Sequence, residues 1–163
     1  MLRRTSLALA AFAFVALSGC ASAPPPAPIT DVAARTPQLS TLARLVNEAG
    51  LADTLRGTGP FTVFAPSDDA FKAVPAATLA ELARDRDRLR AVLTYHVVPG
   101  TLTSAAVKTE SVKTVNGANV ALSKAGTFVT VEDAVVQTAD VAATNGVVHV
   151  IDRVLMPPAP PRR

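Results

Sequence analysis

One stretch of thirteen residues, Gly59 to Phe71, restricts the fold of this chain more than any other. Its opening Gly-Pro ends the preceding segment. Phe61 to Ala65 then alternates large apolar residues with smaller ones, which predicts a short buried strand. Pro66 stops that strand, Ser67 is a suitable N-cap, and the two carboxylates after it suit the positive end of a helix dipole. The stretch therefore predicts a strand that runs directly into a capped helix, which is a framework rather than a catalytic centre.

The first nineteen residues have the pattern of a secretory signal and are expected to lie outside the fold. Two arginines precede an apolar run from Leu7 to Leu17, which is shorter than a membrane-spanning helix of about 20 residues. The run ends in Leu17-Ser18-Gly19-Cys20, which resembles a bacterial lipobox. Cys20 is therefore expected to become the lipid-modified first residue of the mature chain. The alternative is an ordinary signal peptide with a chance cysteine near its end.

A lipidated Cys20 predicts a protein that is secreted across the inner membrane and held at a membrane by its acyl chains. The residue after the cysteine is Ala21 and not Asp, and this pattern resembles that of lipoproteins sorted to the outer membrane of Gram-negative bacteria. The alternative is a soluble periplasmic or extracellular protein. Residues 20–29 are rich in proline, which predicts an extended linker of about 25–30 Å between lipid and domain. Residues 158–163, rich in Pro and Arg, are expected to form a tail outside the domain.

The charge of the chain does not indicate a nucleic-acid partner. The whole chain carries +3, but without residues 1–19 it has 14 basic and 13 acidic residues and no basic stripe. The single cysteine cannot form an internal disulfide. The roughly 144 residues that follow the signal are enough for one domain. We expect that domain over residues 30–157, and we expect a monomer.

Helical spacing dominates the first part of this domain. Thr36-Pro37 combines an N-cap residue with a proline at the first helical position, which predicts a helix start. The apolar residues that follow form one stripe, so this helix is expected to pack on a core, and Gly50 is expected to end it. A shorter helical turn is predicted over Leu51 to Leu55.

A later helix carries one of the two histidines on its apolar face. Asp85 or Asp87 is expected to cap this helix. Four residues of the helix recur at i, i+3, i+4 and i+7, namely Leu89, Val92, Leu93 and His96. Val97-Val98 is expected to be extended, and Pro99-Gly100 to form a turn.

The second part of the domain changes to the period of strands. Val112–Val115 and Val120–Leu122 flank Asn116-Gly117, a dipeptide favoured in hairpin turns. Three later runs are also predicted as strands, Phe128–Val131, Val135–Thr138 and Val147–Ile151. The last is apolar throughout, which suits a strand buried on both faces. Helices before strands, with one early strand, predict the α+β class.

Three of these segments together resemble the fasciclin domain family. Gly59 to Phe71 resembles the first signature block of that family, and Asn145 to Pro157 resembles the second. Leu93 to Gly100 is similar to the Tyr-His segment between them. The three segments occur in the order and spacing of the family and cover about Thr30 to Pro157. The residues of the two blocks that we expect to be structural are Phe61, Phe64, Pro66, Ser67, Asp68, Phe71, Asn145, Gly146, His149 and Asp152.

The resemblance implies a wedge of β-strands with α-helices packed against it. It also implies adhesion through protein–protein or protein–carbohydrate contacts at a cell surface or matrix, with no catalysis and no cofactor. In animal relatives two short segments are linked to integrin binding. One is the Tyr-His pair, here Tyr95-His96; the other is an Asp-Ile pair before the second block, here Asp140-Val141. These four residues are the candidates for partner contact.

Each prominent polar residue also has a structural interpretation. His96 is expected to be a core histidine with a hydrogen-bond partner, because it shares the apolar face of its helix. Tyr95 lies one step off that face and is expected to reach the surface more readily. His149 shares a strand face with apolar neighbours and is expected to be buried with a satisfied ring nitrogen. Asp152 is expected to bond to His149 or to the backbone, or to cap the strand end.

The sequence offers no arrangement typical of an enzyme. The two histidines are more than fifty residues apart without companions at ligand spacing, and neither a Gly-x-Ser-x-Gly elbow nor a phosphate-binding loop occurs. We therefore predict an envelope-anchored interaction module that binds a protein or polysaccharide. The alternative is a periplasmic carrier or sensor that binds a small hydrophobic ligand in an apolar groove beside Tyr95-His96.

Overall fold

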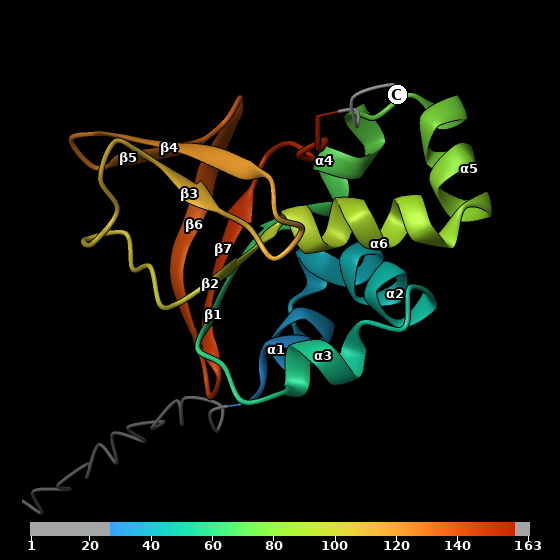
Figure 1. Cartoon of the computed structure of the whole chain (residues 1–163), viewed down its shortest axis with the longest axis horizontal. Coiled ribbons are helices and arrows are strands. Elements are labelled where there is room, and N and C mark those ends of the chain that lie inside the picture. The colour runs from blue at the N-terminus through green and yellow to red at the C-terminus, as the bar shows by residue number, and fades with distance from the viewer. Residues whose placement is uncertain (1–26, 159–163) are drawn as a thin grey trace, which may run out of the picture.

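The structure, a computed structural model, describes residues 27–158, so Cys20, most of the linker and residues 159–163 lie outside it. A group of helices lies on one side of a curved sheet (Figure 1). The helices of the described range are α1 (Ile29–Arg35), the 3₁₀ helix η1 (Pro37–Leu39), α2 (Ser40–Glu48), α3 (Ala52–Arg56), α4 (Asp68–Ala73), α5 (Ala76–Arg84) and α6 (Arg86–Tyr95). Its strands are β1 (Phe61–Pro66), β2 (Val97–Pro99), β3 (Glu110–Lys113), β4 (Asn119–Ala125), β5 (Phe128–Val131), β6 (Ala134–Ala143) and β7 (Gly146–Ile151). The predicted α+β class is confirmed.

The two signature blocks meet at the centre of the sheet. β1 and β7 pair in parallel, from Phe61 opposite Gly146 to Pro66 opposite Ile151. Both strands are buried from their second residue onward, as their continuous apolar character predicts. Their pairing brings together two segments that are far apart in sequence, and it closes the core.

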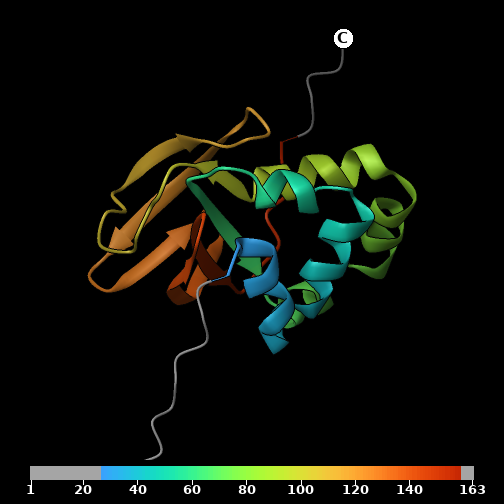
Figure 2. The ribbon, with the colours of Figure 1, turned by 90° about the horizontal axis from the view of Figure 1, so that it is seen from below.

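The sheet divides the core into two apolar clusters. Its strand order is β2-β1-β7-β6-β5-β4-β3, and every neighbouring pair except β1–β7 is antiparallel. Because successive side chains of a strand point to opposite faces, Val63 and Ala65 join the cluster beneath the helices, whereas Phe64 joins the cluster inside the curled β3–β6 half. Figure 2 shows α1 on the helical side, where it contacts β7.

The first long helix begins later than its sequence predicts. Pro37 starts the 3₁₀ helix η1, and the α-helix α2 begins only at Ser40. Thr36 lies at the N-cap position of η1, but its hydroxyl donates back to Val32 O of α1 at 2.7 Å instead of capping. The predicted end is confirmed, since Gly50 adopts a φ of +68° just beyond α2.

The N-terminus of α2 is capped by another helix. Ser67 caps α4 as predicted, with its hydroxyl 3.2 Å from the Ala70 N–H. Asp68, in the first turn of α4, accepts the Thr41 N–H at 2.8 Å and the Ser40 hydroxyl at 2.7 Å. Partial burial of Asp68 acts to raise the pKa of its carboxyl group. The hydrogen bonds from Ser40 and Thr41 act in the opposite direction and leave this pKa lowered. Asp68 therefore stabilises two helices, although the sequence alone links it to only one.

The strands of the second half follow the predicted hairpins, with one extension. β3 and β4 pair across a loop in which Gly117 has a φ of +97°, as expected for Asn116-Gly117. β6 continues well past Thr138, its predicted end, to Ala143. The register of β6 against β7 shifts on either side of Thr138, and Asp140 adopts a φ of +58°. A bulge therefore carries the Asp-Val pair.

Candidate functional site

The predicted Tyr-His pair lies where α6 ends and β2 begins, and both side chains are buried. Tyr95 is 3% exposed and His96 is 1% exposed. The prediction of a core histidine is confirmed, whereas the expectation that Tyr95 reaches the surface is wrong. The Tyr95 ring packs in the cluster inside the curled sheet, and its hydroxyl lies 3.0 Å from Asn119 O and 3.3 Å from a Glu132 carboxylate oxygen. Burial, and then the charge of Glu132, raise the pKa of Tyr95.

Both ring nitrogens of His96 are hydrogen-bonded to the backbone. Nε2 accepts the N–H of Leu155 at 2.9 Å, so the ring proton is on Nδ1, which donates to Val92 O at 2.8 Å. Burial lowers the pKa of His96 to about 4, and the ring is therefore neutral at pH 7. His96 joins the end of α6 to the segment that follows β7.

The Asp-Val pair occupies the bulge of β6, and Asp140 is exposed. The Asp140 carboxylate accepts the Ser104 N–H at 2.8 Å and also the Ser104 hydroxyl. The hydroxyl bond is the main reason why the pKa of Asp140 is lowered, and the charge of Lys124 adds to it. Lys124 in turn donates from Nζ to Ser104 O at 2.7 Å. Val141 is half-buried and packs against the cluster beneath the helices.

One row of residues across the sheet connects the two pairs. His96 O accepts the N–H of Phe64 at 2.9 Å, and Phe64 lies opposite His149 in the β1–β7 register. The Phe64 and His149 rings stack with their centroids 5.6 Å apart. His149 Nδ1 then accepts the Asp140 N–H at 3.2 Å. The structure therefore places Tyr95-His96 in the interior and Asp140 at the exposed end of the same row.

The other expected structural residues bond to the backbone of neighbouring segments. His149 is buried, and its Nε2 donates to Leu102 O at 2.7 Å. Asp152 accepts the Val135 N–H at 2.7 Å, so it bonds to the backbone rather than to His149. Asn145 accepts the Ile29 N–H at 3.0 Å and donates to Leu55 O at 2.6 Å and to Gly57 O at 3.2 Å. One side chain thereby fixes the start of α1 and the end of α3.

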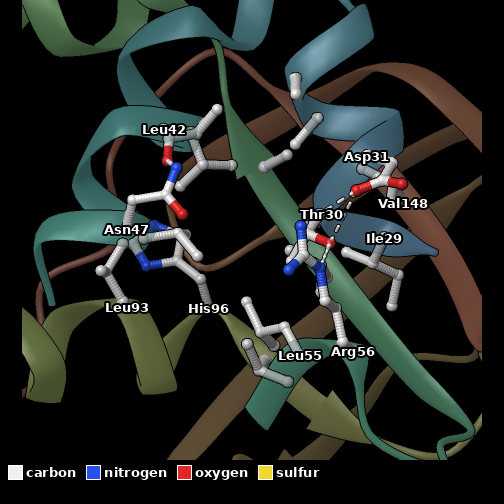
Figure 3. A pocket seen from close by; sticks show the side chains of 17 residues that line it. Ile29, Thr30, Asp31, Leu42, Asn47, Leu55, Arg56, Leu93, His96 and Val148 are labelled. Carbon is white, nitrogen blue, oxygen red and sulfur yellow. Dashed lines mark hydrogen bonds and ion pairs between the residues drawn. The ribbon is translucent and has the colours of Figure 1, made fainter. Parts of the chain in front are cut away.

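A cavity of about 80 Å³ lies on the helical side of His96 (Figure 3). Its walls come from α1, α2, α3, α6 and the strands below them, and are formed mainly by Ile29, Ala33, Leu42, Ala43, Val46, Leu55, Val63, Ala65, Leu93, Val97 and Val148. Leu93, His96 and Val97 place it beside the Tyr-His segment, although Tyr95 itself faces the other cluster. An apolar hollow next to that segment was expected for a carrier, but the sequence does not indicate that α1 would cover it.

The mouth of the cavity is polar. Arg56 of α3 donates from Nε to the Thr30 hydroxyl at 3.2 Å, and its Nη2 lies 3.4 Å from the Asp31 carboxylate. Figure 3 shows these three side chains on one side of the hollow and Asn47 on the other. The charges of Asp31 and Arg56 cancel, so the mouth offers hydrogen-bond donors and acceptors without a net charge.

Within residues 27–158, the polar groups of the interior are satisfied. No buried side-chain nitrogen or oxygen of this range lacks a hydrogen-bond partner. In the same range, no three His, Cys, Asp or Glu side chains are close enough together to hold a metal ion. None of the helices described is long and apolar enough to cross a membrane.

Comparison with known proteins gives consistent matches. A family model described as the Fasciclin domain matches residues 37–157, which leaves α1 just outside the matched region. Protein sll1483 of Synechocystis sp. is 46% identical over 132 residues, covering 80% of this chain and 73% of that protein. The cell surface glycolipoprotein MPB83 of Mycobacterium bovis is 37% identical over 137 residues, covering 81% of this chain and 61% of that protein.

A solved structure shares the fold. It is a FAS1 domain pair from the insect cell adhesion molecule Fasciclin I, with a TM-score of 0.59 and 30% sequence identity. The similarity covers 75% of this chain and 46% of that one, as expected when one domain matches half of a pair.

Proposed function

Because this chain belongs to the fasciclin domain family, we propose that it is a non-catalytic adhesion module of the cell envelope, which binds a protein or polysaccharide as a monomer. Family membership is the observation that carries the proposal. It is supported by relatives whose names place them at cell surfaces, a mycobacterial glycolipoprotein and an insect adhesion molecule.

The proposed location is a membrane surface, with Cys20 as the lipid anchor. Cys20 lies outside the described residues, so this proposal is supported by the lipobox-like sequence alone. A lipid on Cys20 and a proline-rich linker would hold the domain close to, but clear of, the bilayer. A soluble periplasmic or extracellular protein remains the alternative.

The proposed contact region is the β6 bulge. Of the four candidate contact residues, Asp140 is exposed, Val141 is half-buried, and Tyr95 and His96 are in the core. We assign direct contact to Asp140 and Val141, and we assign the buried pair a positioning role through the Phe64–His149 row. Since Ser104 holds the Asp140 carboxylate in place, a partner meets a fixed charge rather than a mobile one.

The proposal is tested by attachment and by direct binding. Deletion of the gene is expected to reduce aggregation or surface attachment of the cells, and the purified chain is expected to retain a protein or polysaccharide from envelope and matrix extracts. Asp140→Asn keeps a residue type that tolerates positive φ but removes the charge, so it is expected to weaken retention at least several-fold. Asp53→Asn, on exposed α3, is the matched control. Unchanged attachment together with no retained partner would disprove the proposal.

The cavity beside His96 favours a second function, a carrier or sensor of a small hydrophobic ligand. An apolar hollow with a few polar groups at its mouth has the lining that is usual for a small-molecule site, and its volume of about 80 Å³ restricts it to small ligands. A ligand that binds only the folded state raises the melting temperature by mass action. A thermal-shift screen of lipids and hydrophobic metabolites is therefore expected to give hits under this second function and a flat result without it.

A further inference from the structure

We propose that the cavity beneath α1 binds the short alkyl end of an uncharged amphiphile, whose hydroxyl or amide head lies between Asp31, Arg56 and Asn47. This inference rests on the second candidate function and specifies its ligand. It does not depend on the adhesion proposal. Three features of the molecule support this ligand: the size of the cavity, the charge of its mouth and the helix that covers it.

The size of the cavity sets the length of the alkyl group. Ala33 of α1 and Ala65 of β1 are buried and contribute only methyl groups to the walls, which leaves the hollow between helix and sheet. An apolar cavity of about 150 Å³ stays dry and binds benzene. The cavity of about 80 Å³ is roughly half that size. It therefore has room for an alkyl group of about four carbon atoms rather than for a ring or a long acyl chain.

The mouth of the cavity disfavours a ligand with a charged head group. Asp31 and Arg56 are paired with each other, and their side chains are 38% and 54% exposed, so a ligand head can reach both. A carboxylate attracted by Arg56 is repelled by Asp31, and an ammonium group attracted by Asp31 is repelled by Arg56. A hydroxyl or an amide can donate to Asp31 and accept from Arg56 or Asn47 without either repulsion.

The helix that covers the cavity, α1, is held to the sheet. α1 lies outside the residues matched by the family model, yet it provides one wall and part of the mouth. Its first turn is held by the bond from Ile29 N–H to Asn145 and by the bond from Thr144 N–H to Ala27 O at 3.0 Å. The wall is therefore fixed to the sheet at its start, and the hollow beneath it is preformed.

The test is a titration of the full chain with 1-alkanols, followed by the NMR signals of the methyl groups of Ile29, Val63 and Val148. Saturable shifts at these methyl groups are expected, with a Kd on the order of 1 mM for 1-butanol. Each added carbon is expected to tighten the Kd about fourfold until the cavity is full near butanol, after which the gain should stop.

A filled cavity provides the control. Ala33→Leu places an isobutyl group in the hollow and is expected to abolish the saturable shifts. Ala77→Leu makes the same change on an exposed position of α5 and is expected to bind 1-butanol like the unmodified chain. If the Ala33→Leu chain binds 1-butanol with unchanged Kd, the cavity is not the site. Should that variant fail to fold, the methyl shifts of the unmodified chain still locate the ligand.

Ligands with the same alkyl group but different head groups distinguish a wrong head group from a wrong carrier function. Butanoate and butylamine are expected to bind at least tenfold more weakly than 1-butanol. If either binds more tightly than 1-butanol at these methyl groups, the uncharged head is wrong while the carrier function stands. If none of the three gives saturable shifts there, both the ligand class and the carrier function are overturned.

Discussion

At the scale of single residues, the two histidines hold the fold together rather than providing chemistry. Each ring accepts one backbone N–H and donates to one backbone carbonyl, His96 between α6 and Leu155 and His149 between the β6 bulge and Leu102. Neither ring has a free nitrogen to act as a base or a ligand. The Tyr-His motif is therefore connected to the surface only through the row formed by Phe64, His149 and Asp140.

Stability should fall in mild acid because His96 is buried as the neutral ring. Its pKa is 6.5 when unfolded and about 4 when folded, so between these values the unfolded chain binds more protons. The stabilisation is complete above pH 6.5, decreases as the pH falls toward 4, and amounts to about 3 kcal/mol in total. Urea unfolding between pH 7 and pH 4 should show this decrease.

The matched variant for this prediction is His96→Gln, which does not titrate in this range. Its unfolding free energy is expected to change less with pH than that of the unmodified chain, and the difference between the two slopes isolates His96 from the carboxylates. Equal slopes in the two chains would contradict a buried neutral His96.

The helical spacing that placed His96 in the core could not place Tyr95. His96 lies at i+7 from Leu89 on the apolar face of α6, and this is the face that packs toward the other helices. Tyr95 lies on the next face, which a helix at the surface would expose. The end of α6 is instead enclosed on both faces, because the curled β3–β6 half covers the second one. That enclosure depends on strands that begin 15 residues or more further along the chain, and a local pattern does not contain it.

At the scale of secondary-structure elements, the tightest requirement is the contact between β1 and the start of β7. A Cβ atom added to Gly146 would lie 1.8 Å from Phe61 O, a backbone atom of the partner strand. A Cβ added to Gly59 would lie 2.1 Å from Asn145 O on the same seam. The glycines at this end of the two signature blocks therefore allow the two strands to approach each other.

Gly146→Ala should separate β1 from β7 and destabilise the domain by about 4 kcal/mol or more, since the clash involves backbone that cannot rotate away. The expected result is a large loss of soluble protein or a much lower urea midpoint. Gly126→Ala is the control, because Gly126 has a φ of +63° but open space around it. That variant should cost only about 1–2 kcal/mol. Similar losses in the two variants would show that φ, and not the approach of the strands, is what requires Gly146.

Asn145→Ala should loosen α1 and α3 without unfolding the sheet. The substitution removes three hydrogen bonds, to Ile29, Leu55 and Gly57, and leaves partly buried backbone groups without partners. We expect a loss of about 2 kcal/mol and faster amide hydrogen exchange in residues 29–35 and 52–56 than in β1 or β7. Uniformly faster exchange across the domain would contradict a local role.

Most elements could be predicted from the sequence, and the exceptions share a cause. The strand-to-helix stretch, the end of α2 at Gly50 and the β3–β4 hairpin follow from local turn and cap chemistry. The second half of β6 and the capping of α2 by Asp68 do not follow from any local pattern. Ala139-Asp140 has little strand preference, and the cap of α2 lies 27 residues away from Thr41. The cavity likewise depends on how α1 packs against β1. The alanines that line it do not indicate a cavity when the sequence is considered alone.

At the scale of the whole molecule, the two ends of the described chain lie beside different elements of the domain. Ala27 lies beside the β6–β7 turn, where its carbonyl accepts the Thr144 N–H, whereas Pro158 lies beside α5 and α6. A tether before Ala27 would therefore direct the β6–β7 turn toward the membrane. α5 and the C-terminal end would point away from it.

Cys20→Ala should release the protein from the membrane if the lipobox is functional. Membrane and soluble fractions of cells that produce the unmodified chain are expected to contain the protein mainly in the membrane, and those with Cys20→Ala mainly in the soluble fraction or still attached through an uncleaved signal. The size of the product on a gel distinguishes these two forms. A mature-sized Cys20→Ala protein that stays in the membrane fraction would show that lipid on Cys20 is not the tether.

The parallel pairing of β1 with β7 also determines when this domain can fold. Phe61 and Gly146 are neighbours in the sheet but are separated by 85 residues of chain. The central pair cannot form until β7 has been synthesised, and the 85 residues between these two positions take about 4–17 s to make at about 5–20 residues per second. Long-range parallel pairing is also slow in itself, because a long loop must close before any contact is gained. A nascent chain that has not yet presented β7 therefore lacks the central strand pair of its sheet.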